Sequence, residues 1–356
     1  MAKEENTPAS KKSSFQETAA FVSVAVVFFL MGFLVHPFYA RYAYPPSEEL
    51  TARGTIKRLG TTRLINPLLE CEVADKREIV EFEPIQEMIE REIAVEIANK
   101  NAAKISVYFR GMDSGRWVGI NEDEPYPGGS LVKIPFLFAY YKLAEQTPEI
   151  LNEHLTYKGD FDQTPQQTTK PSKTIEAGHA YSIDELLYRM IVYSGNNSTI
   201  LLMHRLDRNY LNGVFADLGV SKDQDSDRQW VVTTKTFSSF FRVLYNGTYL
   251  SHSLSQRALE LLTQTEFSEG LVAGVPSTVK VAHKFGEEIF ADTTGHVLSA
   301  TLHDCGIVYQ AHHAYFLCVM TEGTRLEPLK GVISRISRAV YQFVDSPAYP
   351  LSKPPA

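Results

Sequence analysis

The order of strand-like and helix-like segments constrains the fold of this chain more than any other feature. Strand patterns occur at 104–110, 116–120, 279–286, 306–309 and 315–320. Apolar residues at helical spacing predict a helix from Pro84, mainly helices over 136–271, and a last helix from about Pro328. Because strands lie at both ends and helices in the middle, we expect an α+β domain whose antiparallel sheet is built from both ends of the chain.

The N-terminal residues have the pattern of a membrane anchor. Residues 1–18 form a polar tail, and residues 19–40 are almost uninterruptedly apolar, which is about the 20 residues that a bilayer requires. A cleaved signal peptide is the alternative. Since no Ala-x-Ala site follows the apolar run, we favour an uncleaved transmembrane helix over 19–40.

Lysines are more frequent before this apolar run than after it. Lys3, Lys11 and Lys12 precede it, and only Arg41 follows closely, so we expect a cytoplasmic N-terminus and a single-pass protein of the cell membrane. The catalytic domain would then be extracytoplasmic. Beyond the anchor we predict a stalk or linker over 41–80, a folded domain over 81–346 and a tail over 347–356.

Composition excludes several classes of function. The formal net charge is −7 and no long run of Lys or Arg occurs, so we expect no nucleic-acid partner. Three cysteines, at positions 71, 305 and 318, are too few for a disulfide framework. No Cys/His spacing typical of zinc occurs, and we expect no metal and no cofactor.

Two of the cysteines fall on neighbouring predicted strands. Cys305 and Cys318 would face each other if the turn between them, around Gln310, is symmetric. A cross-strand disulfide is one possibility outside the cytoplasm. We favour two free thiols in the core, since free cysteine is among the most buried residue types.

Three short motifs occur at boundaries between predicted elements: Ser130-x-x-Lys133, Ser194-Gly195-Asn196 and Lys284-Phe285-Gly286. A Ser and a Lys three residues apart at a helix start share one face, so the amine can reach the hydroxyl. A serine hydroxyl is a weak nucleophile that needs such an adjacent base. The helix start also offers backbone N–H groups to a developing oxyanion. The first motif alone therefore predicts a nucleophile with its base.

The three motifs, in this order, resemble those of the penicillin-recognising serine hydrolases, and the chain is most similar to their class A β-lactamase-like family. The resemblance covers about residues 80–345 and includes Tyr126-Pro127 and the strand at 303–309. It implies a β-lactamase/transpeptidase-like fold. About five antiparallel strands would be flanked by the N- and C-terminal helices, with an all-helical subdomain beside them.

The resemblance also implies roles for four catalytic residues. Ser130 would attack a carbonyl and form an acyl-enzyme, and Lys133 would accept its proton once burial and neighbouring cations lower the lysine pKa. Ser194 would pass a proton to the leaving nitrogen. Lys284 would attract the substrate carboxylate and keep the site positive.

The substrate-binding residues that the resemblance implies are Asn196, Phe285, Gly286 and Glu287. Asn196 would bond the substrate amide and help to hold Lys133. The backbone N–H groups of Ser130 and Glu287, the residue after the third motif, would form the oxyanion hole.

The chain departs from the family pattern at three places. Position 285 is Phe where the family usually has Thr or Ser, so recognition of a substrate carboxylate should be weakened or changed. Position 195 is Gly instead of Asp. No Glu occurs between Leu186 and Leu259, where the family carries the Glu that activates water for deacylation. Of the aspartates in that region, none is an obvious substitute.

The function that we expect is that of a membrane-anchored serine hydrolase, which forms an acyl-enzyme and hydrolyses the amide of a β-lactam. The alternatives are a D-Ala-D-Ala peptidase or penicillin-binding protein acting on peptidoglycan stem peptides, a slowly deacylating β-lactam sensor, and an inactive binding module. The expected partners are thus a small β-lactam or a stem peptide, and the membrane.

Overall fold

The computed structural model describes residues 57–58, 68–69, 83–220, 230–311, 313–347 and 349. The chain divides into two units, Met1–Thr55 and Ile56–Ala356, and every described residue belongs to the second. The predicted tail 1–18 and transmembrane helix 19–40 lie outside the described residues, as does most of the predicted stalk. None of the helices over the described ranges is long and apolar enough to cross a membrane.

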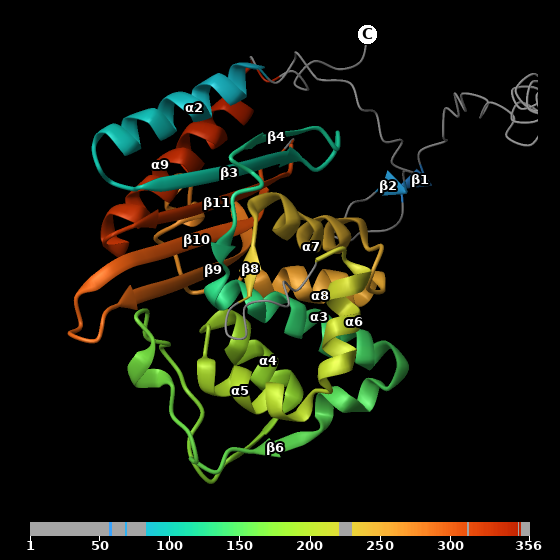
Figure 1. Cartoon of the computed structure of the whole chain (residues 1–356). Helices are drawn as coiled ribbons and strands as arrows, with labels where there is room; N and C mark the ends of the chain where they lie inside the picture. Colours follow the sequence, from blue (N-terminus) through green and yellow to red (C-terminus); the bar gives the residue numbers. More distant parts are fainter. Residues whose placement is uncertain are drawn as a thin grey trace, which may run out of the picture. The chain divides into compact units, whose positions relative to one another are not determined.

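A five-stranded antiparallel sheet forms the centre of the domain, in the order β4-β3-β11-β10-β9 (Figure 1). Its strands are β3 (Lys104–Gly111), β4 (Trp117–Ile120), β9 (Lys280–Ala291), β10 (Val297–Tyr309) and β11 (Tyr315–Gly323). This confirms the predicted sheet of about five strands from both ends of the chain. The β9–β10 hairpin is longer than predicted, since its outer part carries polar and exposed residues that hide the strand pattern.

Two helices cover one face of the sheet, α2 (Glu83–Ala98) and α9 (Leu326–Val344) (Figure 1). The apolar stripe of α2, with Ile85 and Ile89, packs with Val332 and Ile336 of α9 and with the sheet residues in one buried cluster. Burial of such stripes is the main source of helix stability in a folded domain. These are the predicted N- and C-terminal flanking helices.

The opposite face of the sheet carries the helical part of the domain, around a second buried cluster. Its helices are α3 (Lys133–Gln146), α4 (Ile183–Val192), α5 (Asn196–Arg205), α6 (Arg208–Asp217), α7 (Thr234–Asn246) and α8 (His252–Leu262). The described residues also include three two-stranded sheets. They pair β1 (Lys57–Arg58) with β2 (Leu68–Leu69), β5 (Tyr126–Pro127) with β8 (Val231–Val232), and β6 (His154–Thr156) with β7 (Ala180–Ser182). Single 3₁₀ turns are η2 (Gly129–Val132), η3 (Pro148–Asn152), η4 (Thr164–Gln166) and η5 (Leu271–Gly274).

Local sequence signals set several helix ends. The Ser182 hydroxyl accepts a hydrogen bond from the backbone N–H of Glu185 at 3.1 Å, which caps α4 as its sequence predicts. Gly247 has φ +60° and ends α7 in the left-handed conformation that glycine adopts without a Cβ clash. Because α4 is fixed at its start, the segment after it, Tyr193–Asn196, has a defined position at the edge of the sheet.

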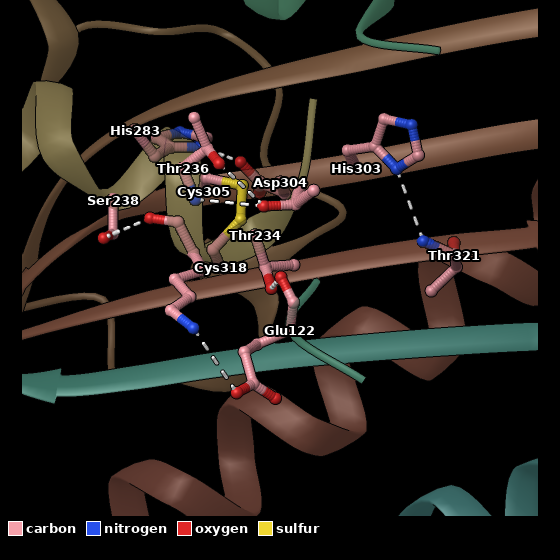
Figure 2. Close-up of a disulfide and its surroundings, with 12 residues drawn as sticks. Glu122, Thr234, Thr236, Ser238, His283, His303, Asp304, Cys305, Cys318 and Thr321 are labelled. Carbon is pink, nitrogen blue, oxygen red and sulfur yellow. Dashed lines mark hydrogen bonds and ion pairs between the residues drawn. A yellow bond between two sulfur atoms is a disulfide. The ribbon is translucent and has the colours of Figure 1, made fainter. Parts of the chain in front are cut away.

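A disulfide joins Cys305 of β10 to Cys318 of β11, which corrects our expectation of two free thiols. The two cysteines are directly opposite in the strand register, with Cα atoms 3.9 Å apart and no exposed surface. Figure 2 shows the bond between the strands, with His283 and Asp304 beside it. The strand register explains the bond, because directly opposite residues of an antiparallel pair have their side chains on the same face and close together.

Candidate active site

The Ser130 turn is held between the sheet and the helical part. Tyr126 of β5 is buried and its hydroxyl lies 3.1 Å from the Ser106 hydroxyl of β3. The carbonyl oxygen of Pro127 lies 2.9 Å from Nε2 of His303 on β10. With β5 fixed at both residues, η2 places Ser130 at the N-terminus of α3, as the first motif predicts.

Lys133, the first residue of α3, is 2 % exposed. Its amine contacts the polar residues of the first two motifs, Ser130, Ser194 and Asn196. Its Nζ lies 2.9 Å from the Ser130 hydroxyl and 3.1 Å from the Ser194 hydroxyl. It also lies 2.6 Å from the Ser194 carbonyl oxygen and 2.7 Å from Oδ1 of Asn196. The two carbonyl oxygens can only accept hydrogen bonds, so they take the two N–H groups of a neutral amine. Its lone pair is then left for a hydroxyl.

Burial lowers the pKa of Lys133 well below its ordinary value of 10.5. The positive charge of Lys284 lowers it further, and the Glu287 carboxylate acts in the opposite direction. Removal of an ammonium group from water disfavours its charged form, and a second cation nearby does the same. Lys133 thus has the environment of a general base for Ser130.

Ser194 lies between two lysines. Its hydroxyl oxygen is 3.1 Å from Nζ of Lys133 and 2.9 Å from Nζ of Lys284, and the residue is 2 % exposed. Its φ is +54°, in the left-handed region that residues other than glycine rarely adopt. The residue in this conformation has its hydroxyl between the two lysine amines, and backbone strain of this kind is typical of functional sites.

Lys284 of β9 has no exposed surface, and its Nζ makes two hydrogen bonds within the protein. It bonds the Ser194 hydroxyl and, at 3.2 Å, the Phe285 carbonyl oxygen, and it lies 4.2 Å from the centroid of the Phe285 ring. Burial lowers the pKa of Lys284 to about 7, although the carboxylates of Asp304 and Glu287 oppose this shift. Phe285 in turn stacks on Phe267 at 4.3 Å. The ring therefore covers Lys284.

Asn196 begins α5 and is fixed by a residue that the sequence did not single out. Its backbone N–H donates to Oε1 of Gln167 at 3.1 Å, and Nε2 of Gln167 donates to the Ser194 carbonyl oxygen at 3.1 Å. Gln167 thus bridges the second motif. Asn197 is also buried, and it bonds Gln163, Asp162 and Thr164. These contacts hold the loop 157–179, which joins β6 to β7, against the site.

Two glycines let β9 approach the Ser130 turn closely. A Cβ at Gly286 would lie 2.6 Å from the Gly128 carbonyl oxygen, and a Cβ at Gly129, whose φ is +49°, would lie 2.8 Å from the Glu287 carbonyl oxygen. The backbone of Glu287 therefore lies beside the turn that carries Ser130. This is the arrangement that the predicted oxyanion hole requires, and the assignment of its two N–H groups stays a prediction.

The Glu287 side chain reaches across to the loop 157–179. Its carboxylate accepts a hydrogen bond from the Thr169 backbone N–H at 2.5 Å and one from the Thr169 hydroxyl at 2.8 Å. Neither Gln167, Thr169 nor Asn197 belongs to a motif, and their role depends on tertiary position.

A cavity of about 580 Å³ opens beside Ser130. Its described lining includes Ser130, Lys133, Ser194 and Asn196 from the motifs, together with Phe285, Glu287, Glu288 and the loop residues Gln163 and Gln166–Thr169. Lys284 is not among them. A substrate in this cavity would meet a serine with its base on one side and β9 on the other, which is the geometry of acyl transfer.

The described residues between Leu186 and Leu259 include no Glu that could act in the deacylation step, as the sequence requires. Asp217, at the end of α6, accepts a hydrogen bond from the Tyr249 hydroxyl and does not line the cavity. Positions 223, 225 and 227 lie outside the described residues. Over the described ranges, no group of three or more His, Cys, Asp or Glu residues is placed to hold a metal ion.

A model of the β-lactamase enzyme family matches residues 88–344 of this chain. A comparison with curated proteins found no match.

Solved structures share the fold at low sequence identity. A variant of PBP-A, solved as an acyl-enzyme complex with penicillin G, is 23 % identical with a TM-score of 0.59, covering 72 % of this chain and 95 % of that one. A β-lactamase from Sphaerobacter thermophilus is 18 % identical with a TM-score of 0.60, covering 72 % and 96 %. The TLA-3 extended-spectrum β-lactamase is 18 % identical with a TM-score of 0.61, covering 73 % and 100 %. The domain thus has the β-lactamase-like fold.

Proposed function

The chain belongs to the β-lactamase enzyme family of serine hydrolases, and on this premise we propose that it forms an acyl-enzyme at Ser130 and opens the amide of a β-lactam. One observation carries the proposal. The Ser130 hydroxyl lies 2.9 Å from Nζ of Lys133, a buried amine whose pKa is lowered well below 10.5. A nucleophile beside its own base is what acyl transfer needs.

In the proposed reaction, Lys133 accepts the Ser130 proton while the serine oxygen bonds to the substrate carbonyl carbon. The oxyanion is stabilised by the N–H groups of Ser130 and Glu287. The C–N bond then breaks, and the nitrogen receives a proton through Ser194, whose hydroxyl lies between Lys133 and Lys284. Asn196 holds Lys133 and bonds the substrate amide. Water afterwards hydrolyses the ester, which releases Ser130.

A second candidate is a D-Ala-D-Ala peptidase or penicillin-binding protein that acts on peptidoglycan stem peptides, or a β-lactam sensor that deacylates slowly. The absence of Glu between Leu186 and Leu259 favours it, since a Glu in this region is the usual base of deacylation. The PBP-A variant solved as a penicillin G acyl-enzyme shows that this fold can hold such an intermediate.

For the location we propose a single-pass anchor over 19–40, with a cytoplasmic N-terminus and the hydrolase domain on the extracytoplasmic side of the cell membrane. The apolar run and the lysines before it support this. The Cys305–Cys318 disulfide supports it independently, because disulfides persist in oxidising compartments.

Time-resolved mass spectrometry with a penicillin tests the function. We expect an adduct on Ser130 that is absent in Ser130→Ala. An adduct that decays within seconds supports a β-lactamase, and one that persists for hours supports the penicillin-binding protein or sensor. If neither a penicillin nor a stem-peptide thioester modifies Ser130, the proposed acyl chemistry is wrong.

A further inference from the structure

The described lining of the Ser130 cavity carries more negative than positive charge. Lys133 is its one lysine or arginine over the described residues, and its pKa is lowered well below 10.5, whereas Glu287 and Glu288 both line it. Lys133 is buried and held by four oxygen atoms. An anionic group in the cavity would therefore meet carboxylates before it met an available ammonium.

Lys284, the other cation of the site, lies behind the cavity wall. It has no exposed surface, bonds Ser194 and the Phe285 carbonyl oxygen, and is covered by the Phe285 ring at 4.2 Å. Phe285 offers a substrate no hydrogen-bond donor. Neither of these two side chains is therefore placed to donate a hydrogen bond directly to a substrate carboxylate.

The Glu287 carboxylate is fixed at the cavity by the protein itself. Thr169 on the facing loop donates two hydrogen bonds to it, at 2.5 and 2.8 Å, and these bonds hold the charge at the cavity. Its negative charge also reaches the centre of the site, because it raises the pKa of Lys133 and of Lys284 against the effect of burial. Glu287 follows Phe285 by two residues on β9, so the two lie on the same side of the strand.

From this arrangement we propose that Glu287 is a specificity-determining residue, which selects acyl donors that are neutral or cationic beside the scissile amide and disfavours those with a carboxylate there. The inference rests on the proposed function, since it names the substrate class of the same serine. Like charges brought together in a partly desolvated site repel, and this repulsion is a common basis of discrimination.

A purely structural role is the competing explanation, in which Glu287 only ties the loop 157–179 to β9. Glu287→Gln separates the two, because an amide keeps the size of the side chain and an oxygen that can accept from Thr169, and loses the charge. Glu266→Gln is the matched control. Glu266 also bonds this loop, through the Ser172 hydroxyl at 2.9 Å, but it is exposed and is not part of the described cavity lining.

The experiment measures acylation of Ser130 in the full chain by a chromogenic cephalosporin with its free carboxylate and by the methyl ester of the same compound. We expect the wild type to be acylated faster by the ester. The acid-to-ester rate ratio should rise about tenfold in Glu287→Gln and stay unchanged in Glu266→Gln. In the wild type the ratio should also rise with salt, which screens charge repulsion without any mutation.

Three results would overturn the inference. A ratio that is equal in wild type and Glu287→Gln, and insensitive to salt, would leave Glu287 with a structural role only. If neither compound acylates Ser130, the proposed function is wrong and the inference falls with it. Acylation by both compounds with no charge preference overturns the inference and leaves the proposed function in place.

Discussion

The Cys305–Cys318 disulfide should supply a measurable part of the stability of this domain. The two cysteines are 13 residues apart in sequence, and the bond closes a short loop that includes the β10–β11 turn. Closing a loop of this size removes about 10 cal/mol/K of entropy from the unfolded chain, which is about 3 kcal/mol at 25 °C. We therefore expect Cys305→Val/Cys318→Val to lower the free energy of unfolding by about 3 kcal/mol. Valine fills most of the space and suits a cross-strand pair, so the loss of packing should be small.

Urea unfolding with and without dithiothreitol measures this contribution. All proteins carry Cys71→Ser, so that no third thiol can exchange. The wild-type midpoint should fall by about 1 M urea in dithiothreitol, to that of the valine variant, whose own midpoint should not change. The reasoning would be refuted if the wild type and the variant unfolded at the same urea concentration under oxidising conditions.

Three further predictions concern the site. Lys284 has a pKa of about 7 in the folded protein and 10.5 as its ordinary value, so the unfolded chain binds the extra proton between these pH values and stability must rise with pH. Between pH 7 and 9.5 the free energy of unfolding in urea should increase by at least about 1.4 kcal/mol more in the wild type than in Lys284→Met. An equal increase in both proteins would contradict the lowered pKa of Lys284. Asn197→Ala leaves the Gln163 N–H without its acceptor and should lower the free energy of unfolding by about 1–3 kcal/mol, measured by thermal unfolding. Asn209→Ala, at an exposed position of α6, is the control. Gly129→Ala places a Cβ 2.8 Å from the Glu287 carbonyl oxygen, at a residue with positive φ. We expect acylation of Ser130 to slow at least about tenfold while the circular dichroism spectrum is unchanged. An unchanged rate would show that acylation does not need the close contact between β9 and the Ser130 turn.

The parts of the site that sequence predicts are those defined by short-range chemistry. Ser130 and Lys133 share one helical turn, and their contact follows from that spacing. Ser194 and Lys284 are far from this turn in sequence. Only the resemblance to a known family predicted that they lie beside Ser130 and Lys133. The structure brings all four together, within hydrogen-bond distance of the Ser194 hydroxyl or of Lys133.

The parts that sequence does not predict depend on register and on loop position. Thr169 and Gln167 belong to a loop with no periodicity, and only the fold places them against Glu287 and the second motif. The same holds for Cys305 and Cys318, since composition favours thiols whereas strand register places them opposite each other. For Glu287 the resemblance implied a role for the backbone N–H alone, and only the structure places its side chain in the lining of the cavity.

The rate of Ser130 acylation by a penicillin, in wild type and in Lys133→Ala, tests the central claim that a buried Lys133 activates Ser130. We predict a wild-type rate that falls little from alkaline to neutral pH, since the pKa of Lys133 is lowered well below 10.5. Removal of a general base typically costs 10²–10⁴-fold, so the variant should be acylated about 10³-fold more slowly while its circular dichroism spectrum is unchanged. A folded Lys133→Ala protein that is acylated as fast as the wild type would contradict the account.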